Sequence, residues 1–213
     1  MENSLDNNLM RLKTEFAKMC RIAESMLEEA NALLIKADKE KALEVVKKDK
    51  LVDDAEMDIE HGCMRLLLRN QPFAKDFRDI SCILKAITDV ERIGDQSADI
   101  AGIVPCLSGK VKIKSIIDMG KLAVEMVRSS CSSLINEDIE LAEKTQVLDD
   151  DMDRLFDKAL GEIVDVIKES SEHAREVAEL LMIAKYYERI GDHAVNICEW
   201  AQFGNTGIHK KTQ

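Results

Sequence analysis

Apolar residues recur every three or four positions through most of the chain, which is the period of an amphipathic helix. Pro72 and Pro105 interrupt this pattern, because the residue before a proline is disfavoured in helical geometry. The helices expected before the second proline run from Leu5 to about Ile35, from about Lys39 to Lys47, from about Asp49 to Asn70 and from about Ala74 to Val104.

The same order of apolar segments then begins again. Asn136-Glu137-Asp138 corresponds to the earlier turn Ala37-Asp38-Lys39, and Ser170-Ser171 stands where the first half has Gln71-Pro72. The helices expected here run from Ile113 to about Ile135, from Ile139 to Gln146, from Asp149 to about Glu169 and from about Ala174 to Ala201. The chain therefore divides into two similar units, residues 1–105 and 110–203, followed by a polar and flexible tail, residues 204–213.

Composition agrees with helices throughout. The 213 residues include 2 prolines and 9 glycines, 33% are charged and 4% are aromatic, a mixture that favours long helices over sheets. We expect an all-α protein made of two tandem three-helix bundles that are related by an internal repeat.

Charge and hydropathy narrow the classes of function. A net charge of −11 leaves no basic excess for nucleic acid and discourages adsorption to an anionic membrane. No stretch approaches the roughly 18 apolar residues of a membrane span, and the N-terminus lacks a signal pattern, so we expect no membrane insertion and a cytoplasmic location. The 6 cysteines form no C-x-x-C and are expected to be free core thiols.

One pentapeptide, E-R-I-G-D, occurs twice, at Glu91–Asp95 and at Glu188–Asp192. Its glutamate and aspartate are four residues apart, so each copy presents two carboxylates on one face of a helix. Like charges at this spacing destabilise an isolated helix by a few tenths of a kcal/mol. A duplicated pair therefore predicts a cationic partner, while Gly94 and Gly191 inside the helices indicate close helix approach or a tolerated core glycine.

The preceding helix of each unit carries a matching pattern, D-x-x-Φ-D, in which Φ is apolar. It comprises Asp49 and Asp53 in the first unit and Asp149 and Asp153 in the second. In the first unit, Asp53 and Glu91 both lie about 17 residues from the hairpin turn, roughly 25 Å along helices that rise ~1.5 Å per residue. Two antiparallel helices are thus expected to bring four carboxylates together in each unit.

Four carboxylates that share a site cannot all stay ionised without a cation, because like charges raise each other's pKa. Oxygen ligands suit Mg²⁺, Mn²⁺, Ca²⁺ or oxidised iron, and Zn²⁺ also binds carboxylates. We therefore predict a metal site in each unit; the alternative is a solvated acidic face paired with Arg92 and Arg189. The predicted ligands are Asp49, Asp53, Glu91 and Asp95 in the first unit and Asp149, Asp153, Glu188 and Asp192 in the second, with Asp99 and Asn196 as additional possible ligands.

Several short segments, taken in order, carry a resemblance to a known family. They are Asp49-x-x-Val52-Asp53, Arg65-Leu66-Leu67, Gln71-Pro72, Asp76-Phe77-Arg78, Glu91–Asp95, Asp149-x-x-Met152-Asp153, Glu188–Asp192 and Asn196-Ile197-Cys198-Glu199. Together they resemble the two halves of PhoU, a family of phosphate-signalling regulators, over nearly the whole chain. The second unit departs from the family pattern at its hairpin, which leaves its metal geometry less well defined.

The resemblance implies a pair of three-helix bundles that bind iron or zinc clusters, or other divalent ions such as Mg²⁺ or Mn²⁺, through these motifs. It also implies a negative regulator, or repressor, of phosphate uptake and of the phosphate-starvation response. The implied partners are the ATPase subunit of a phosphate ABC transporter and a sensor histidine kinase, and the implied assembly is a homodimer.

Two other classes of function compete with this interpretation. One is a metal-independent helical adaptor, or an accessory protein of another phosphate transporter, whose acidic faces bind basic surfaces. The other is a carboxylate-bridged di-iron enzyme, but the 4 histidines do not form the Glu-x-x-His pattern of those sites. The chain also lacks G-x-S-x-G, P-loop and G-x-G-x-x-G motifs, so we expect no enzymatic activity.

Overall fold

The structure is a computed structural model that describes residues 2–70 and 72–208. This part of the chain is almost entirely helical and contains no strand, which confirms the all-α prediction. Two short 3₁₀ turns, Val104–Cys106 and Ser171–His173, adjoin the long helices. The α-helices are α1 (Glu2–Ile35), α2 (Lys39–Asn70), α3 (Ala74–Ile103), α4 (Lys114–Asn136), α5 (Ile139–Glu169) and α6 (Ala174–Thr206).

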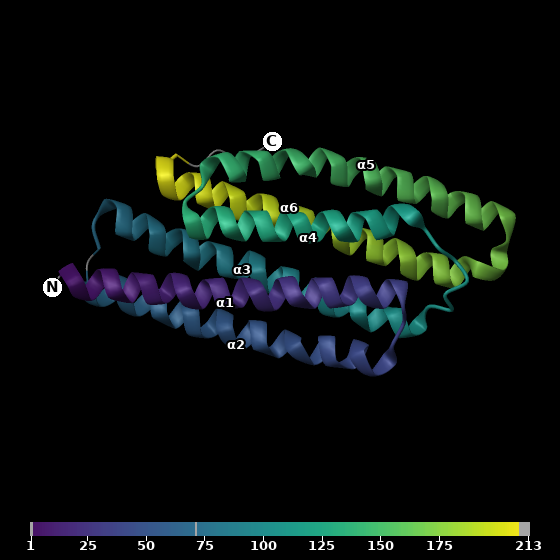
Figure 1. Cartoon of the computed structure of the whole chain (residues 1–213), viewed down its shortest axis with the longest axis horizontal. Coiled ribbons are helices and arrows are strands. Elements are labelled where there is room, and N and C mark those ends of the chain that lie inside the picture. Colours follow the sequence, from purple (N-terminus) through teal and green to yellow (C-terminus); the bar gives the residue numbers. More distant parts are fainter. Residues whose placement is uncertain (1, 71, 209–213) are drawn as a thin grey trace.

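The helices form two bundles that lie side by side along the long axis of the molecule (Figure 1). Helices α1, α2 and α3 pack against one another, and α4, α5 and α6 do the same. The bundles meet where the antiparallel helices α3 and α6 pack together and where α1 contacts α4. This arrangement confirms two tandem three-helix bundles, and it places the helices that carry E-R-I-G-D at the centre of the molecule.

Two of the expected helix boundaries are wrong. The short pieces predicted at Lys39–Lys47 and Ile139–Gln146 are the first turns of α2 and α5, which run on without a break. No proline or glycine separates the short and long segments, so nothing in the backbone ends the helix there. Matching aspartates begin both helices: Asp38 Oδ1 accepts hydrogen bonds from the amides of Glu40 and Lys41, and Asp138 Oδ1 accepts one from Leu141.

The last helix also extends beyond its predicted end near Ala201, through Thr206. The Gly204 carbonyl accepts a hydrogen bond from Arg78 Nε at 3.3 Å, and Asn205 Nδ2 donates one to the Glu137 carbonyl at 3.2 Å. Gly207, with a φ of 70°, then ends the helix in the left-handed conformation. Residues 204–206 thus belong to the last helix, residues 207–208 follow it, and residues 209–213 of the predicted tail lie outside the described residues.

Aliphatic side chains fill both bundles and the seam between them. Five of the cysteines are buried free thiols, as predicted, and Cys106 is exposed. A polar tie crosses the seam: the Tyr187 hydroxyl, itself fully buried, donates to Asn31 Oδ1 at 2.5 Å, and Asn31 Nδ2 donates to the Gly120 carbonyl at 2.7 Å. The helices of the described chain include none that is long and apolar enough to span a membrane.

Candidate metal centre

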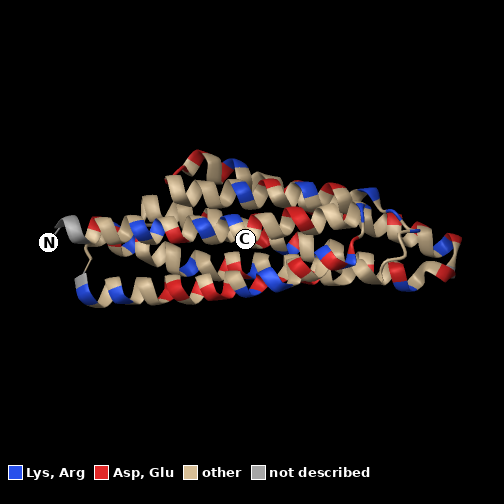
Figure 2. Ribbon diagram, turned by 60° about the horizontal axis from the view of Figure 1, so that its bottom comes forward, with Lys and Arg blue, Asp and Glu red and all other residues tan. Residues whose placement is uncertain are grey.

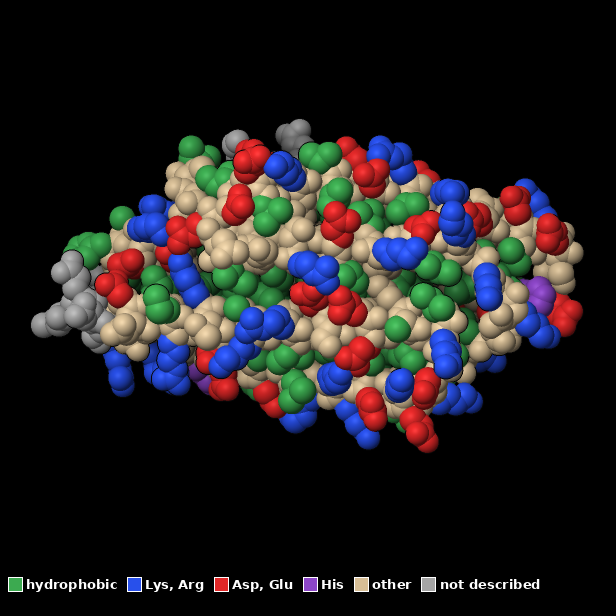
Figure 3. All heavy atoms as spheres, viewed as in Figure 1, with side chains coloured by type: hydrophobic (Ala, Val, Ile, Leu, Met, Phe, Trp, Pro, Cys, Tyr) green, Lys and Arg blue, Asp and Glu red, His purple; other side chains and the backbone are tan. Residues whose placement is uncertain are grey.

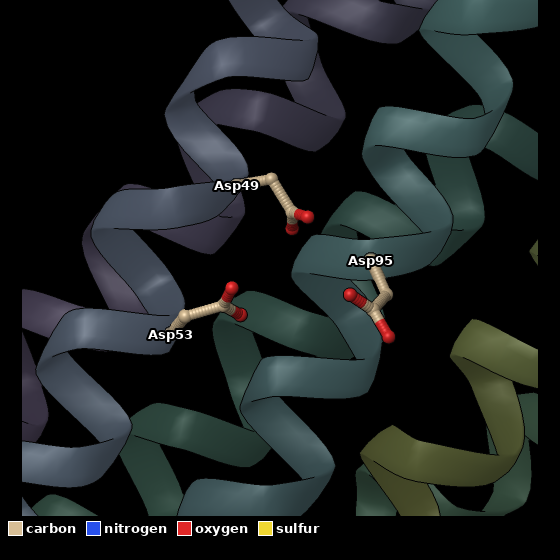
Figure 4. Close-up of side chains that lie close together, drawn as sticks. All are labelled: Asp49, Asp53 and Asp95. Atoms are coloured by element: carbon tan, nitrogen blue, oxygen red, sulfur yellow. The ribbon is translucent and has the colours of Figure 1, made fainter.

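Three of the predicted ligands in the first bundle come together between α2 and α3. Asp49 and Asp53 on α2 and Asp95 on α3 each offer one carboxylate oxygen, and these three oxygens lie within 4.8 Å of one another. Figure 4 shows the Asp49 and Asp53 side chains extending from α2 toward α3, where Asp95 lies on the facing helix. This spacing is short enough for one cation to contact all three carboxylates.

The local sequence explains why the two helices bring these groups together. Asp49 and Asp53 are one turn apart on α2, so they share a face, and Val52 between them is fully buried against α3. A Cβ atom added to Gly94 would lie 3.2 Å from both Cγ atoms of Val52. The glycine of the first E-R-I-G-D copy therefore permits a close helix approach beside the carboxylates, as one of the two sequence interpretations proposed.

The carboxyl groups of this centre are hard to ionise together. Burial raises the pKa of Asp49 to about 6, and the charges of Asp95, Asp53 and Asp99 add to the effect. Burial likewise raises the pKa of Glu91 to about 7, with Asp95 as the next cause, and Arg92 opposes the shift. A bound cation would reverse this balance by stabilising the ionised forms.

Two buried carboxylate oxygens at this centre lack a hydrogen-bond donor in the described part of the chain, which is compatible with a cation bound there. Asp49 Oδ1 and Glu91 Oε2 are buried and have no hydrogen-bond donor among the described residues. Arg92 Nε lies 3.3 Å from that Glu91 oxygen without hydrogen-bond geometry, and its Nη1 lies 3.0 Å from Asp95 Oδ2. Buried acceptors in native proteins nearly always have a partner. An oxygen-binding ion at this centre would supply one to Asp49 and Glu91.

The second bundle repeats the arrangement with a looser geometry. Burial and then the charge of Asp192 raise the pKa of Asp149 to about 6. Burial and then the charge of Glu188 raise the pKa of Asp192. A Cβ atom added to Gly191 would lie 3.4 Å from Met152 Cγ, so α5 and α6 also approach closely here. The repeated pattern thus brings the acidic pairs of both bundles within electrostatic reach.

The two centres differ in how closely their carboxylates gather. Within the described residues only the first bundle holds three carboxylate oxygens in one tight group. In the second, Lys185 Nζ binds Glu188 Oε1 at 2.6 Å, while Glu188 Oε2 stays buried without a partner. The structure therefore brings together Asp49, Asp53 and Asp95, with Glu91 beside them, more tightly than the predicted second set, Asp149, Asp153, Glu188 and Asp192.

The two additional candidates lie toward the seam between the bundles. Asn196 Nδ2 donates to Asp89 Oδ1 on α3 at 3.0 Å, and burial and then the nearby Asp99 raise the pKa of the Tyr186 hydroxyl on α6. His193 Nδ1 lies 2.9 Å from the same Asp89 oxygen. Asp99 is still close enough to raise the pKa of Asp49, whereas the amide of Asn196 faces the opposite bundle.

Sequence reasoning missed Asp89 and Tyr186, although a signal for them exists. Superimposing the two copies of E-R-I-G-D pairs Asp89 with Tyr186 and Asp99 with Asn196. The contacts Asp89 to Asn196 and Asp99 to Tyr186 are therefore equivalent under the exchange of the two units. A hollow lined by Asp49, Asp95 and Asp99 is bordered by Tyr186 as well, so the second bundle contributes to the surroundings of the first centre.

Comparison with known proteins places this geometry in context. The PhoU domain matches the chain twice, over residues 16–104 and 116–201. A phosphate-specific transport system accessory protein PhoU homolog of Clostridium acetobutylicum is 31% identical over 95% of this chain and 94% of its own length. A protein of the same description from Xylella fastidiosa is 35% identical over 92% of this chain and 84% of its own length.

Solved structures agree with both the fold and the repeat. The crystal structure of the phosphate transport system regulatory protein PhoU from Streptococcus pneumoniae superimposes with a TM-score of 0.92 at 26% identity, over 98% of this chain and 100% of that one. The crystal structure of PhoU from Pseudomonas aeruginosa gives a TM-score of 0.90 at 28% identity, over 95% and 99%. The matched domain coincides with each of the two bundles described above.

Proposed function

The chain belongs to the PhoU family, and from that premise we propose that it is a metal-binding negative regulator of phosphate transport and of phosphate-starvation signalling. The observation that carries the metal part is the group formed by Asp49, Asp53 and Asp95, in which Asp49 Oδ1 is buried without a donor. The regulatory part is supported by relatives described as accessory proteins of phosphate-specific transport systems. Neither part requires enzymatic activity.

A bound metal would link two helices of the same bundle. Asp49 and Asp53 from α2 and Asp95 from α3 would hold it, with Glu91 as a further oxygen ligand, and the bound ion supplies positive charge. Oxygen ligation suits iron, Mg²⁺ or Mn²⁺, and Zn²⁺ accepts the same carboxylates. Because the ligands come from two helices, occupancy would hold α2 and α3 in one register, and the same logic applies to α5 and α6.

We further propose that the protein acts by docking. Its partners would be the ATPase subunit of a phosphate ABC transporter and a sensor histidine kinase, and its assembly would be a homodimer. The long bundles provide rigid helical faces, and the net charge of −11 favours partners with basic contact surfaces. Figure 2 shows acidic residues over the middle of α2 and basic residues at its C-terminal end, so different parts of one helix suit different partners.

One observation favours a metal-independent adaptor as the second candidate. The chain supplies cations of its own to both centres, because Arg92 binds Asp95 and Lys185 binds Glu188. These pairs are partly exposed, however, and exposed ion pairs contribute little to stability. They also leave buried oxygens of Asp49, Glu91 and Glu188 without a hydrogen-bond donor among the described residues, so we rank the metal-binding regulator first.

Deletion of the gene tests the regulatory role. At high phosphate, the deletion strain should take up more phosphate and express starvation genes, and wild-type protein should restore repression. The double variant Asp49→Asn with Asp95→Asn should fail to restore it if the metal is required. Unchanged uptake and expression in the deletion strain would rule out negative regulation. Full repression by the double variant would instead favour the metal-independent adaptor.

A further inference from the structure

The outer face of the first bundle contains a hollow of about 800 Å³ between α1 and α2, on the side away from the carboxylate centre. Its accessible apolar lining includes Ile22 from α1 and Leu51 and Ala55 from α2, while Leu12, Met19, Ile59 and Leu66 at its floor are buried. Gly62 permits a close approach of α1 and α2 at this hollow, because a Cβ atom there would lie 3.0 Å from Leu12 Cδ1. The hollow extends along α2 from Leu51 to Arg69, roughly 27 Å at ~1.5 Å per residue.

Three arginines line one end of this groove: Arg11 on α1 and Arg65 and Arg69 on α2. All three are exposed, and the ion pairs of the described residues include none of them. Three carboxylates lie farther along the groove: Glu15 and Asp54 are bound by Lys18 and Lys50, and Asp58 forms no ion pair among the described residues. In a chain with a net charge of −11, this end is thus a local excess of unpaired positive charge. Figure 3 shows basic side chains gathered at the lower left, over the C-terminal end of α2.

Exposed apolar side chains also lie near this end of the bundle, outside the lining of the groove. Met57, Met64 and Leu68 share one edge of α2, at helical spacing, with exposed fractions of 51%, 49% and 82%. Met10 on α1 and Phe73 at the hairpin lie at the same end of the bundle and are 71% and 85% exposed. Exposed apolar groups beside polar ones mark interaction surfaces, and flexible methionines adapt to a partner's shape.

From this combination we propose that the groove binds an amphipathic helix of a partner protein whose apolar stripe is flanked by acidic residues. A length of roughly 27 Å accommodates a helix of about 18 residues, and the accessible apolar lining formed by Ile22, Leu51 and Ala55 matches its stripe. The three unpaired arginines would bind the acidic flank. A lipid surface is the weaker match, because a flat membrane would reach the exposed tip at Leu68 and Phe73 but not the concave lining at Ile22 and Ala55.

Two designed peptides and a charge reversal test the proposal. The acidic peptide is a labelled 18-residue helix with leucines at i, i+3, i+4 and i+7 and glutamates beside them, and the basic peptide has lysine in place of each glutamate. Fluorescence anisotropy would measure their binding to the wild-type chain and to the variant Arg65→Glu with Arg69→Glu. Lys168→Glu with Arg175→Glu, at the corresponding hairpin of the second bundle, changes the charge equally and is the control.

The wild-type chain and the control should bind the acidic peptide, and the double variant at Arg65 and Arg69 should bind it at least 10-fold more weakly and gain affinity for the basic peptide. All three chains should show the same helical circular dichroism, since the replaced side chains are exposed. Equal binding of a sequence-scrambled acidic peptide, or no loss in the double variant, would overturn the proposal. So would arginine-dependent binding to phosphatidylglycerol vesicles without peptide binding, which would assign the surface to a membrane.

Discussion

Individual carboxyl groups at the first centre carry an electrostatic cost that a cation would remove. Asp49 is the clearest case, because it is partly buried, faces Asp53 and Asp95, and has an oxygen without a donor. Asp149 occupies the equivalent place in the second bundle, with a pKa likewise raised to about 6. These residues determine how stability depends on pH when no metal is bound.

The metal-free protein should lose stability as pH rises from about 4 to about 7. Asp49, Glu91 and Asp149 hold their protons in the folded state at pH values where the unfolded chain has lost them, so the folded state binds more protons and the unfolding free energy falls with pH. Urea unfolding across this range measures the slope. Asp49→Asn with Asp149→Asn should flatten it, whereas the exposed control Asp54→Asn should not; an unchanged slope in the double variant would contradict this prediction.

Gly94→Ala should destabilise the protein by about 1–3 kcal/mol, since overpacking a core costs about this much. The new Cβ would meet Val52, which is β-branched and fully buried and so has little freedom to move. Gly161→Ala is the matched control, because a Cβ there meets nothing within 4 Å and should stabilise α5 by up to about 1 kcal/mol. Denaturant unfolding measures the free energy of unfolding of both variants. Equal stability of Gly94→Ala and wild type would count against close packing at this point.

For individual residues, the sequence predicts where carboxylates lie along the helices better than it predicts which ion pairs they form. Helix rise places Asp53 level with Glu91 and Asp49 level with Asp95, and the structure brings Asp49, Asp53 and Asp95 together. The pairing of Lys185 with Glu188 was not foreseen, because it depends on which rotamers the lysine adopts and on the ring of Phe156, over which its Nζ lies. A periodic pattern of apolar residues does not predict side-chain rotamers of this kind.

The sequence predicts some helix ends correctly and others wrongly. A helix end set by a proline is readable from the chain, as at Pro72. The predicted breaks before Asp49 and Asp149 do not exist, because a local dip in amphipathic pattern does not end a helix that has no backbone reason to stop. The extension of α6 to Thr206 depends on Arg78 and Glu137, which are distant in sequence.

The tie between α1, α4 and α6 yields a prediction about how the helices are held. Asn31→Ala should destabilise the fold by about 1–3 kcal/mol, because it leaves the buried Tyr187 hydroxyl without an acceptor. In a double-mutant cycle, Tyr187→Phe should cost less in the Asn31→Ala background than in wild type. Asn136→Ala removes an exposed contact with Ser132 and is the control. Strict additivity of Asn31→Ala and Tyr187→Phe would contradict a shared bond.

In the whole molecule, the internal repeat determines both the two bundles and the two carboxylate centres. Each unit brings one acidic pair from its second helix and one from its third, and the two third helices, α3 and α6, pack against each other. The sequence predicts the units, but not how they dock, because the seam contacts of Asp89 with His193 and Asn196 join residues from different copies. The groove between α1 and α2 likewise becomes visible only when the outer faces are assembled.

Metal content of the purified protein tests the central claim most directly. Chelator-stripped wild-type chain, dialysed against Mn²⁺ or Zn²⁺ at pH 8 and assayed by elemental analysis, should retain at least one ion per chain. Asp53→Asn with Asp95→Asn should lower that content, since it removes two of the three clustered carboxylates. Asp54→Asn with Asp58→Asn, which changes charge equally on the exposed side of α2, should not. A wild-type chain that retains no ion, or an undiminished content in the first variant, would contradict the account.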